Sequence, residues 1–396
     1  MTTAQRHESW LLFRSRPALW ALLRAGRWTG PVRHVPRVGW LVADPVLARR
    51  VLNDHAHTSV LGEGGVGHLW AQVLGDWVTE LFDGPGHAAM RARVRDVFTE
   101  ASARAHVDRV LAPRLAAATA TLAAGGELDV ADLARVLTGR LVADLLGLPG
   151  TTDEQARARF ATAERLAALA VGTGASTHLA PATVATAREL VAELTAGVAD
   201  GWAHAGEDRL LGRCRALGLG RRETEGLAVL MAVAGTGTAA SAMARTVALV
   251  ADTGSAPRLL AAPDLVGDAV REGLRVSTPA PVIGRHVTGD TALGPAALRA
   301  GDRLLVLTHT VDNAAGGFDL DRPYDPATRQ LWFGAGRHQC LGAALAKAEL
   351  AALLRALLAT GRPWRVTGRR AARGVLVPAY AQLRITAARR DAEPRS

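Results

Sequence analysis

One long uncharged segment constrains the fold of this chain more than any other feature. From Gly226 to Ala244 the sequence runs for 19 residues without a charged side chain. That length is just enough to cross a bilayer as a helix, but three glycines, two threonines and a serine dilute its hydrophobicity, and no second such run accompanies it. A chain of 396 residues is large enough to bury this helix in its own core. We therefore predict a long core helix in a protein without a membrane partner.

Helical patterns dominate the rest of the chain, and strand patterns are short. Leucines between 350 and 358 repeat at the spacing of one helix face. Further helices are predicted at about 88–108, 129–148 and 181–203, and strands at 39–42, 302–307 and 374–385. We expect a mainly α protein with a small β portion. It forms a single domain over 1–396, with a helix-rich core at about 80–275 and 338–360, β-rich parts near 35–50, 282–308 and 362–387, and a frayed tail at 388–396.

The formal charge of +10 does not predict nucleic-acid binding. Lys347 is the only lysine, and the many arginines are scattered among acidic residues rather than gathered into a stripe with aromatics. A basic patch for an acidic protein partner stays open. Two cysteines, Cys214 and Cys340, are too few for a disulfide scaffold. Arg14 and Arg16 interrupt the apolar run near the N-terminus, so we expect no secretory leader and a soluble, cytoplasmic protein.

The segment around Cys340 carries the sharpest chemical signal. It reads Phe-Gly-Ala-Gly-Arg-His-Gln-Cys-Leu-Gly from Phe333 to Gly342 and is followed by a helix pattern. Glycines let the backbone turn tightly and bring amide N–H groups near the sulfur, and the helix start adds its positive dipole end. Both effects favour a thiolate. With no second Cys or His at zinc spacing, this thiolate suits a single axial bond to a haem iron. The alternative is a buried structural cysteine, which is the usual role of a lone Cys.

From Phe333 to Ala346 the pattern Phe-Gly-x-Gly-x-His-x-Cys-x-Gly-x-x-Leu-Ala is intact. It resembles the haem-binding loop of the cytochrome P-450 superfamily in its bacterial soluble form, and the resemblance covers nearly the whole chain. It implies a triangular helical domain with haem b between the long distal helix and the Cys-loop helix. It also implies Cys340 as the axial ligand of the iron, with Phe333 and Gly334 beside the haem.

The same resemblance assigns cationic residues elsewhere in the chain to the haem. His87 and Arg91 match a His-x-x-x-Arg that clasps one propionate. Arg285 matches the arginine of the second propionate, and His338 matches a third donor inside the Cys loop. Cationic donors are what two buried carboxylates require.

A structural charge network is also implied. Glu272 and Arg275 match a Glu-x-x-Arg pair of the family, and Arg322 matches the later arginine that locks it. The spacing alone would mean little, because Glu154 and Arg157 share it. The implied role is a buried network and not catalysis.

Within the uncharged segment, Ala234 and Gly235 match the small residues that leave room for dioxygen. Thr238 matches the family threonine, whose hydroxyl bends the helix and hydrogen-bonds to the oxygen. The family usually has Asp or Glu immediately before this threonine, and this chain has Gly237. Protons must then arrive through water, through Thr236 or Thr238, or from the substrate. The departure suggests oxidative decarboxylation, cyclisation or coupling with substrate-assisted protonation rather than plain hydroxylation.

Substrate positions follow from the resemblance only as regions. The candidate pocket residues in them are Trp70, Trp77, Val282, Ile283, Leu376 and Val377. The two tryptophans could stack on a ligand, although tryptophans at helical spacing more often belong to the core.

The sequence shows no pattern of a reductase domain, so we expect the electrons to come from a separate protein. The resemblance implies a ferredoxin-type donor with its ferredoxin reductase. Candidate docking charges are Arg337, Lys347, Arg93 and Arg95.

The sequence therefore favours a haem-thiolate monooxygenase or oxidase that uses O₂ on a small-molecule substrate. Secondary metabolites of the peptide-like or polyketide type, as in actinobacterial antibiotic biosynthesis, are the expected substrates. One alternative is a non-catalytic haem-thiolate auxiliary or sensor protein, which a turnover assay would distinguish. The other is a haem-free helical scaffold, which the absorption spectrum would reveal.

Overall fold

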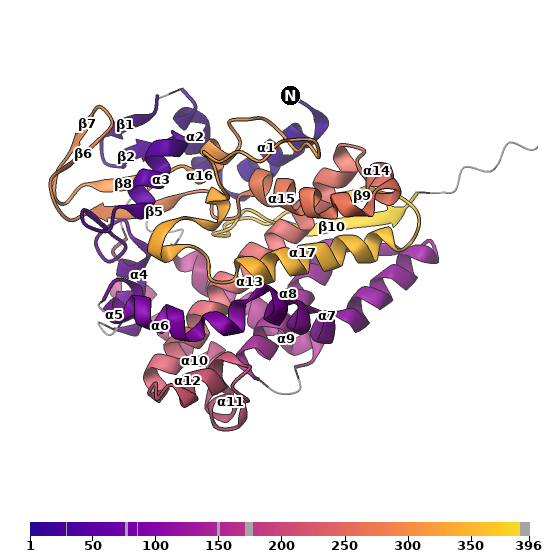
Figure 1. The fold of residues 1–396 in the computed structure, drawn as a ribbon, viewed down its shortest axis with the longest axis horizontal. Helices are drawn as coiled ribbons and strands as arrows, with labels where there is room; N and C mark the ends of the chain where they lie inside the picture. The colour runs from indigo at the N-terminus through magenta and orange to yellow at the C-terminus, as the bar shows by residue number, and fades with distance from the viewer. Residues whose placement is uncertain (29, 76–77, 85, 149–150, 171–176, 389–396) are drawn as a thin grey trace, which may run out of the picture.

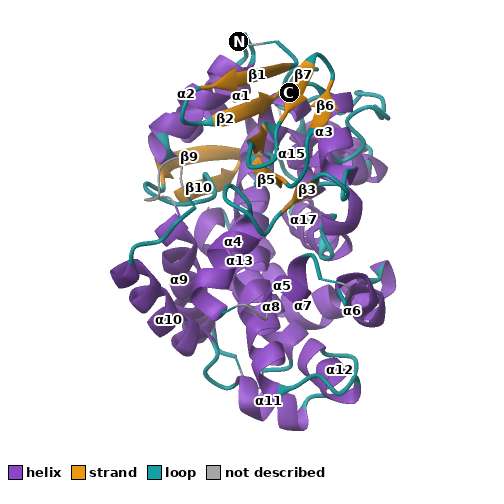
Figure 2. Ribbon diagram, turned by 90° about the vertical axis from the view of Figure 1, so that its left-hand side faces the viewer, coloured by secondary structure: helices purple, strands orange, loops and turns teal. Residues whose placement is uncertain are grey.

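The computed structural model describes residues 1–396 apart from 29, 76–77, 85, 149–150, 171–176 and 389–396. Most strands gather at one end of the molecule, and helices form the rest (Figures 1 and 2). The expectation of a mainly α protein with a small β portion is therefore confirmed. The helices are α1 (Thr3–Ser15), α2 (Pro17–Gly26), α3 (Pro45–Asn53), α4 (Val66–Leu74), α5 (Val78–Phe82), α6 (His87–Val94), α7 (Glu100–Ala123), α8 (Val130–Leu146), α9 (Asp153–Ala168), α10 (Pro181–Leu194), α11 (Val198–His204), α12 (Leu210–Ala216), α13 (Arg221–Asp252), α14 (Ala256–Ala261), α15 (Val266–Ser277), α16 (Thr308–Asp312) and α17 (Ala343–Leu358).

The uncharged segment lies inside α13, as predicted. Every residue of α13 from Ala239 to Val250 is buried, because α8, α9, α15 and α17 pack around the helix. Such a helix has no polar face to present to water. By length and hydropathy α13 could cross a membrane, but 61% of its most apolar window is buried within the protein.

Local capping residues set the helix boundaries, and they break two of the predicted helices. The predicted helix at 88–108 divides at Thr99, whose extended backbone and side chain cap the start of α7 through the Ser102 N–H. The predicted helix at 181–203 divides at Gly197, which has a positive φ of 87°. The helix predicted at 129–148 is α8, capped by Asp129 and ended by Gly147 in the left-handed conformation.

The strands form two sheets and a hairpin. The five-stranded sheet has the order β1-β2-β8-β5-β3, in which β2 and β8 are parallel and the other pairs antiparallel. A three-stranded sheet has the order β4-β10-β9, and β6 pairs with β7. The strands are β1 (Val32–Val35), β2 (Gly39–Val42), β3 (Thr58–Ser59), β4 (Glu127–Asp129), β5 (Ile283–Val287), β6 (Thr291–Leu293), β7 (Ala296–Leu298), β8 (Arg303–Val306), β9 (Trp364–Ala371) and β10 (Tyr380–Ala387).

Two of the predicted β regions need correction. The region near 35–50 contains β2 but then forms α3, because Asp44 caps the helix and Pro45 occupies its first turn. The strand predicted at 374–385 begins only at Tyr380, since the chain between 372 and 379 forms the connection from β9 to β10.

A buried ion pair fastens the N-terminal helix to the core helix. Arg245 of α13 has no exposed surface, and its Nε donates to Glu8 Oε2 of α1 over 3.0 Å. Glu8 is 6% exposed. Both charges are therefore desolvated and depend on each other.

Removing one of these two charges should destabilise the fold strongly. We expect Glu8→Gln to lower the free energy of unfolding by about 3 kcal/mol, because it leaves the Arg245 guanidinium buried without an anion. Urea denaturation followed by circular dichroism measures this. Glu225→Gln is the matched control, since Glu225 pairs with Arg221 on the surface and should change stability by less than about 1 kcal/mol. Equal effects of the two substitutions would contradict the argument.

Candidate active site

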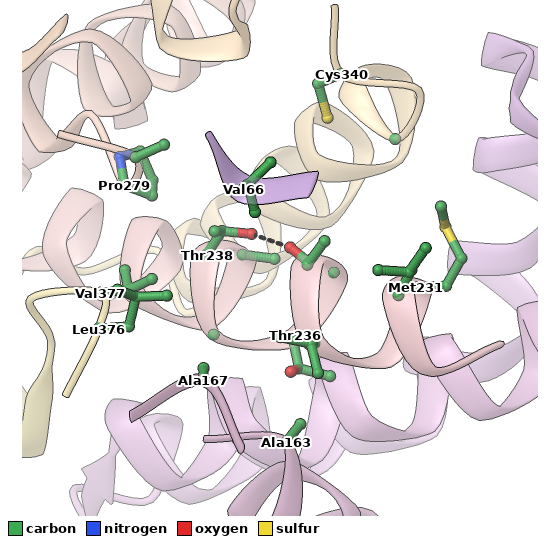
Figure 3. Close-up of a pocket in the computed structure, with 18 of the residues that line it drawn as sticks. Val66, Ala163, Ala167, Met231, Thr236, Thr238, Pro279, Cys340, Leu376 and Val377 are labelled. Carbon is green, nitrogen blue, oxygen red and sulfur yellow. Dashed lines mark hydrogen bonds between the residues drawn. The ribbon is translucent and has the colours of Figure 1, made fainter. Parts of the chain in front are cut away.

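A large cavity lies between α13 and the loop that carries Cys340 (Figure 3). Its volume is about 620 Å³, and its lining is mainly apolar. Side chains of α4, α9, α13 and the β9–β10 connection contribute to its walls, including Val66, Ala163, Ala167, Met231, Leu376 and Val377. A concave, mostly apolar space with a few converging polar groups is typical of a small-molecule site.

Two glycines shape the Cys340 loop. Gly334 and Gly336 have positive φ values of 70° and 67°. A Cβ on Gly336 would lie 2.4 Å from the Leu52 carbonyl oxygen, so only glycine fits there. The Cys340 N–H donates to the Phe333 carbonyl over 2.8 Å, which closes the loop before α17 begins. The loop thus fixes the backbone of Cys340 at the wall of the cavity.

The Cys340 sulfur is exposed to the cavity but not deprotonated by the loop alone. Burial raises the pKa of the Cys340 thiol, and the Gly342 N–H and the Arg91 charge only partly oppose this effect. The start of the helix thus favours the thiolate as expected, through the Gly342 N–H, but burial outweighs this effect in the protein without a bound metal. A metal cation at the sulfur would supply the missing stabilisation, because a coordinating thiol is deprotonated.

Four cationic or potentially cationic side chains line the cavity near Cys340: His87, Arg91, Arg285 and His338. Arg91 donates to the Gln339 carbonyl, and the His87 and His338 rings lie with their centroids 5.0 Å apart. His338 Nε2 lies 2.9 Å from Asp83 Oδ1. The structure thus brings together all four residues that the sequence assigned to propionates.

Arg285 shows that this site fits an anionic group. It is 4% exposed, and within the described residues it forms no ion pair, donating only to the Gly284 carbonyl. Burial lowers the pKa of the guanidinium to about 10. A buried guanidinium without an acid is costly, so a carboxylate brought by a ligand would complete it.

The long helix α13 presents Ala234, Gly235 and Thr238 to the cavity. Thr238 lies on the side of the helix toward Cys340, and its hydroxyl donates to the Ala234 carbonyl over 2.6 Å (Figure 3). A Cβ on Gly237 would meet no atom within 4 Å. The missing acid therefore leaves open space on the cavity wall.

Thr236 is separated from Thr238 by the turn of the helix. Its hydroxyl donates to the Ala232 carbonyl over 2.7 Å, and its side chain faces Ala163 and Ala167 of α9 (Figure 3). Thr236 is 3% exposed. Both candidate threonines line the cavity, but their side chains lie on different sides of α13.

The candidate substrate residues have different positions. Trp70, Ile283, Leu376 and Val377 line the cavity. Val282 does not, because alternation along the extended chain turns it toward an apolar cluster with Leu12, Leu19, Leu23, Leu41 and Leu307. Trp77 lies outside the described residues.

Polar contacts tie α4 to the segment 177–179 at the rim of the cavity. Gln72 Nε2 donates to the Thr177 carbonyl and Gln72 Oε1 accepts from the Leu179 N–H, each over 2.8 Å. His68 Nδ1 lies 2.7 Å from the Thr177 hydroxyl. Because α4 and Leu179 both line the cavity, these bonds hold one of its walls in place. Sequence reasoning missed them, since single polar residues in a loop carry no recognisable pattern.

The Glu272 network is complete in the structure. Arg275 Nε and Nη2 donate to the two Glu272 carboxylate oxygens, each over 2.8 Å, and Arg322 Nε donates to Glu272 Oε2 over 3.1 Å. Arg275 also donates to the carbonyls of Asp312, Gly316 and Gly317. The network joins α15 to the segment that leads toward the Cys340 loop, as expected for a structural role.

Comparison with known proteins gives a consistent result. The sequence model of the Cytochrome P-450 family matches residues 263–360. Cytochrome P-450-SU2 of Streptomyces griseolus is 30% identical over 332 residues, which cover 81% of this chain and 79% of that protein. The mycinamicin VIII C21 methyl hydroxylase of Micromonospora griseorubida is 35% identical over 127 residues, and this match spans 31% of this chain and 33% of the relative. The crystal structure of CalO2 superposes with a TM-score of 0.75 at 25% identity, covering 95% of this chain and 98% of that one.

Proposed function

Because the chain belongs to the cytochrome P-450 family, we propose that it is a haem-thiolate monooxygenase that oxidises a small molecule with O₂ and external electrons. One observation carries the proposal: a cysteine sulfur opens into a large apolar cavity beside a buried arginine that lacks an acid. We also propose that the protein is soluble and cytoplasmic.

The residues near Cys340 would hold haem b. Cys340 would bind the iron, and His87, Arg91, Arg285 and His338 would bind the propionates. Phe333, Gly334, Ala234 and Gly235 line the same cavity and would contact the haem. When bound, the haem supplies reductive activation of O₂.

The side chains of α13 determine how protons reach the reacting oxygen. Thr238 holds a proton on Oγ1 at the helix face toward Cys340, and this hydroxyl donates a hydrogen bond to the Ala234 carbonyl. No acid at position 237 can replace that proton once it is transferred. Thr236 also lines the cavity, but its side chain lies on the side of α13 toward Ala163 and Ala167, and its hydroxyl donates to the Ala232 carbonyl. Protons therefore come from water or from the substrate itself.

The substrate is a secondary metabolite of the polyketide or peptide-like type. A relative is a mycinamicin VIII C21 methyl hydroxylase, and the mainly apolar lining of the cavity, which must also hold the haem, suits an apolar ligand. Substrate-assisted protonation makes oxidative decarboxylation, cyclisation or coupling the favoured reactions. A non-catalytic haem auxiliary or sensor is the second candidate, and Gly237 is the observation that favours it.

Thr238 should matter for turnover, and Thr236 should not. We expect the purified protein to give the carbon monoxide spectrum of a thiolate-ligated haem and to oxidise its substrate with a surrogate ferredoxin and reductase. Thr238→Ala should lower the fraction of electrons recovered in product by about tenfold or more, because the proton on Oγ1 is lost. Thr236→Ala is the matched control and should stay within about twofold. The function proposed here is wrong if the spectrum is absent, or if the wild-type protein consumes no substrate.

Position 237 tests the source of the proton. A Cβ at position 237 meets no atom within 4 Å, so Gly237→Glu adds a proton donor beside Thr238, while Gly237→Gln adds the same volume without an acid. If the substrate delivers the proton, the two variants should couple electrons to product equally well, within about twofold. A large gain with Glu alone, at an unaltered substrate range, would exclude substrate-assisted delivery. The measurement is product formed per NADH consumed.

A ferredoxin-type donor docks on the face formed by α6 and α17. Arg93 and Arg95 are exposed, and within the described residues Arg93, Arg95 and Lys347 form no ion pair. Arg337 is a weaker candidate, because it pairs with Asp83 over 3.1 Å. These positive charges would steer an acidic partner, and the Lys347 ammonium also lies 5.7 Å from the centroid of the Phe333 ring.

Charge reversal should slow reduction of the protein. The double variant Arg93→Glu and Lys347→Glu should lower the rate of electron transfer from ferredoxin by about tenfold at low ionic strength, and salt should diminish the difference. Arg33→Glu, on β1 at the strand-rich end of the molecule, is the control. Stopped-flow reduction measures the rate. An unchanged rate and salt dependence would place the docking surface elsewhere.

A further inference from the structure

A single carboxylate stands out in the wall of the apolar cavity, on α9. Glu164 lines the cavity together with Arg135 of α8, Phe160 of α9 and Tyr380 of β10. Among the described residues that line the cavity, the one other acid is Glu349 of α17. Glu349 is 3% exposed, and burial raises its pKa to about 8, so it is largely neutral at pH 7. Glu164 is therefore the acid of this wall that can present a negative charge to a ligand.

The nearest cation is already engaged with other partners. Arg135 Nη2 donates to the Tyr380 carbonyl over 2.8 Å, and Nη1 donates to the Ala381 carbonyl over 3.2 Å. Its guanidinium also lies over the Phe160 ring, 5.8 Å from the centroid. It forms no ion pair with Glu164. Its position is thus fixed by the backbone of β10 and by an aromatic ring.

Glu164 itself has no such partner. Across the described residues no hydrogen bond or ion pair reaches its carboxylate. Burial raises the pKa of Glu164, and the charge of Arg135 opposes that effect. A half-buried carboxylate without a donor is unfavourable. A ligand that supplies a positive charge would remove this cost, whereas an anionic ligand would add to it.

We propose that Glu164 is the recognition point for a cationic nitrogen on the substrate, at the end of the cavity bounded by Arg135, Phe160 and Tyr380. This rests on the proposed function and adds to it the chemical class of the substrate: an apolar body that carries a basic amine. The apolar walls bind the body, and the carboxylate fixes which end of it faces α9. Charge pairing in a poorly solvated site is strong enough to orient a ligand.

Optical titration of the ferric holoenzyme with three probes of one chain length tests the proposal. The probes are decyltrimethylammonium, decanol and decanoate, used below their micellar concentrations. The quaternary ammonium has no lone pair, so it cannot bind the iron and reports only on the pocket. Calorimetry of the same titrations gives the dissociation constants independently of the iron spin state.

The wild-type protein should bind decyltrimethylammonium at least about tenfold more tightly than decanol, and decanoate the least tightly. Glu164→Gln keeps the side-chain volume and should reduce the preference for the cation to within about twofold, with decanol binding unchanged. Glu154→Gln is the matched control, because Glu154 lies exposed on the first turn of the same helix. It should retain the wild-type preference.

Three results would overturn the proposal. A preference for decanoate would make Arg135 the recognition group, equal binding of all three probes would leave the pocket indifferent to charge, and an unchanged cation preference in Glu164→Gln would place the anion elsewhere. Each of these can occur in a protein with a normal thiolate-haem spectrum and normal turnover. Failure of this inference is thus separable from failure of the proposed function, which would show in the spectrum and in the turnover assay.

Discussion

A helix can be surrounded by other elements only if it carries no charge that needs water, and α13 meets this condition from Gly226 to Ala244. Four helices pack around it, and the cavity opens along its face toward Cys340. Where charge returns, at Arg245, Glu8 of α1 neutralises it inside the protein. The placement of the N-terminal helix, the core and the cavity thus follows from one segment of small and apolar residues.

The second organising element is an excess of positive charge beside the Cys340 loop. Among the residues that the structure describes, Arg285 and Arg91 donate only to backbone carbonyls, and Arg285 is almost fully buried. Asp83 balances part of this charge by pairing with His338 and Arg337. Burial raises the pKa of Asp83, but the hydrogen bonds from His338, Ser59 and the Val60 N–H outweigh it and hold the pKa well below its ordinary value. The remaining cations favour a ligand that carries carboxylates, which is why the loop and the cations belong to one site.

Sequence reasoning located the features that a short motif or a long pattern encodes. The Cys340 loop and the core helix were found because spacing and composition specify them, whereas the Glu272 network followed only from the family resemblance. The helix breaks at Thr99 and Gly197 were missed, because the helical periodicity of the sequence continues through these positions. A single capping residue ends the helix in spite of that periodicity. Val282 was misplaced because adjacent residues of an extended segment face opposite sides, and the sequence did not say which side faces the cavity. The pKa of Cys340 depends on burial, which only the structure reveals.

The chain lacks a carboxylate at position 237 and carries one at Glu164, and the two positions have different consequences. An acid at 237 would stand beside Thr238 and supply protons to the reaction, whereas Glu164 stands on α9 within the electrostatic reach of Arg135. A carboxylate on α9 can hold a ligand in one orientation. Orientation then decides whether an acidic hydrogen of the substrate itself lies near Thr238. Specificity at α9 and proton supply at α13 are in this way linked through the substrate. A ligand that pairs with Glu164 but brings no acidic hydrogen near Thr238 would bind well and turn over poorly.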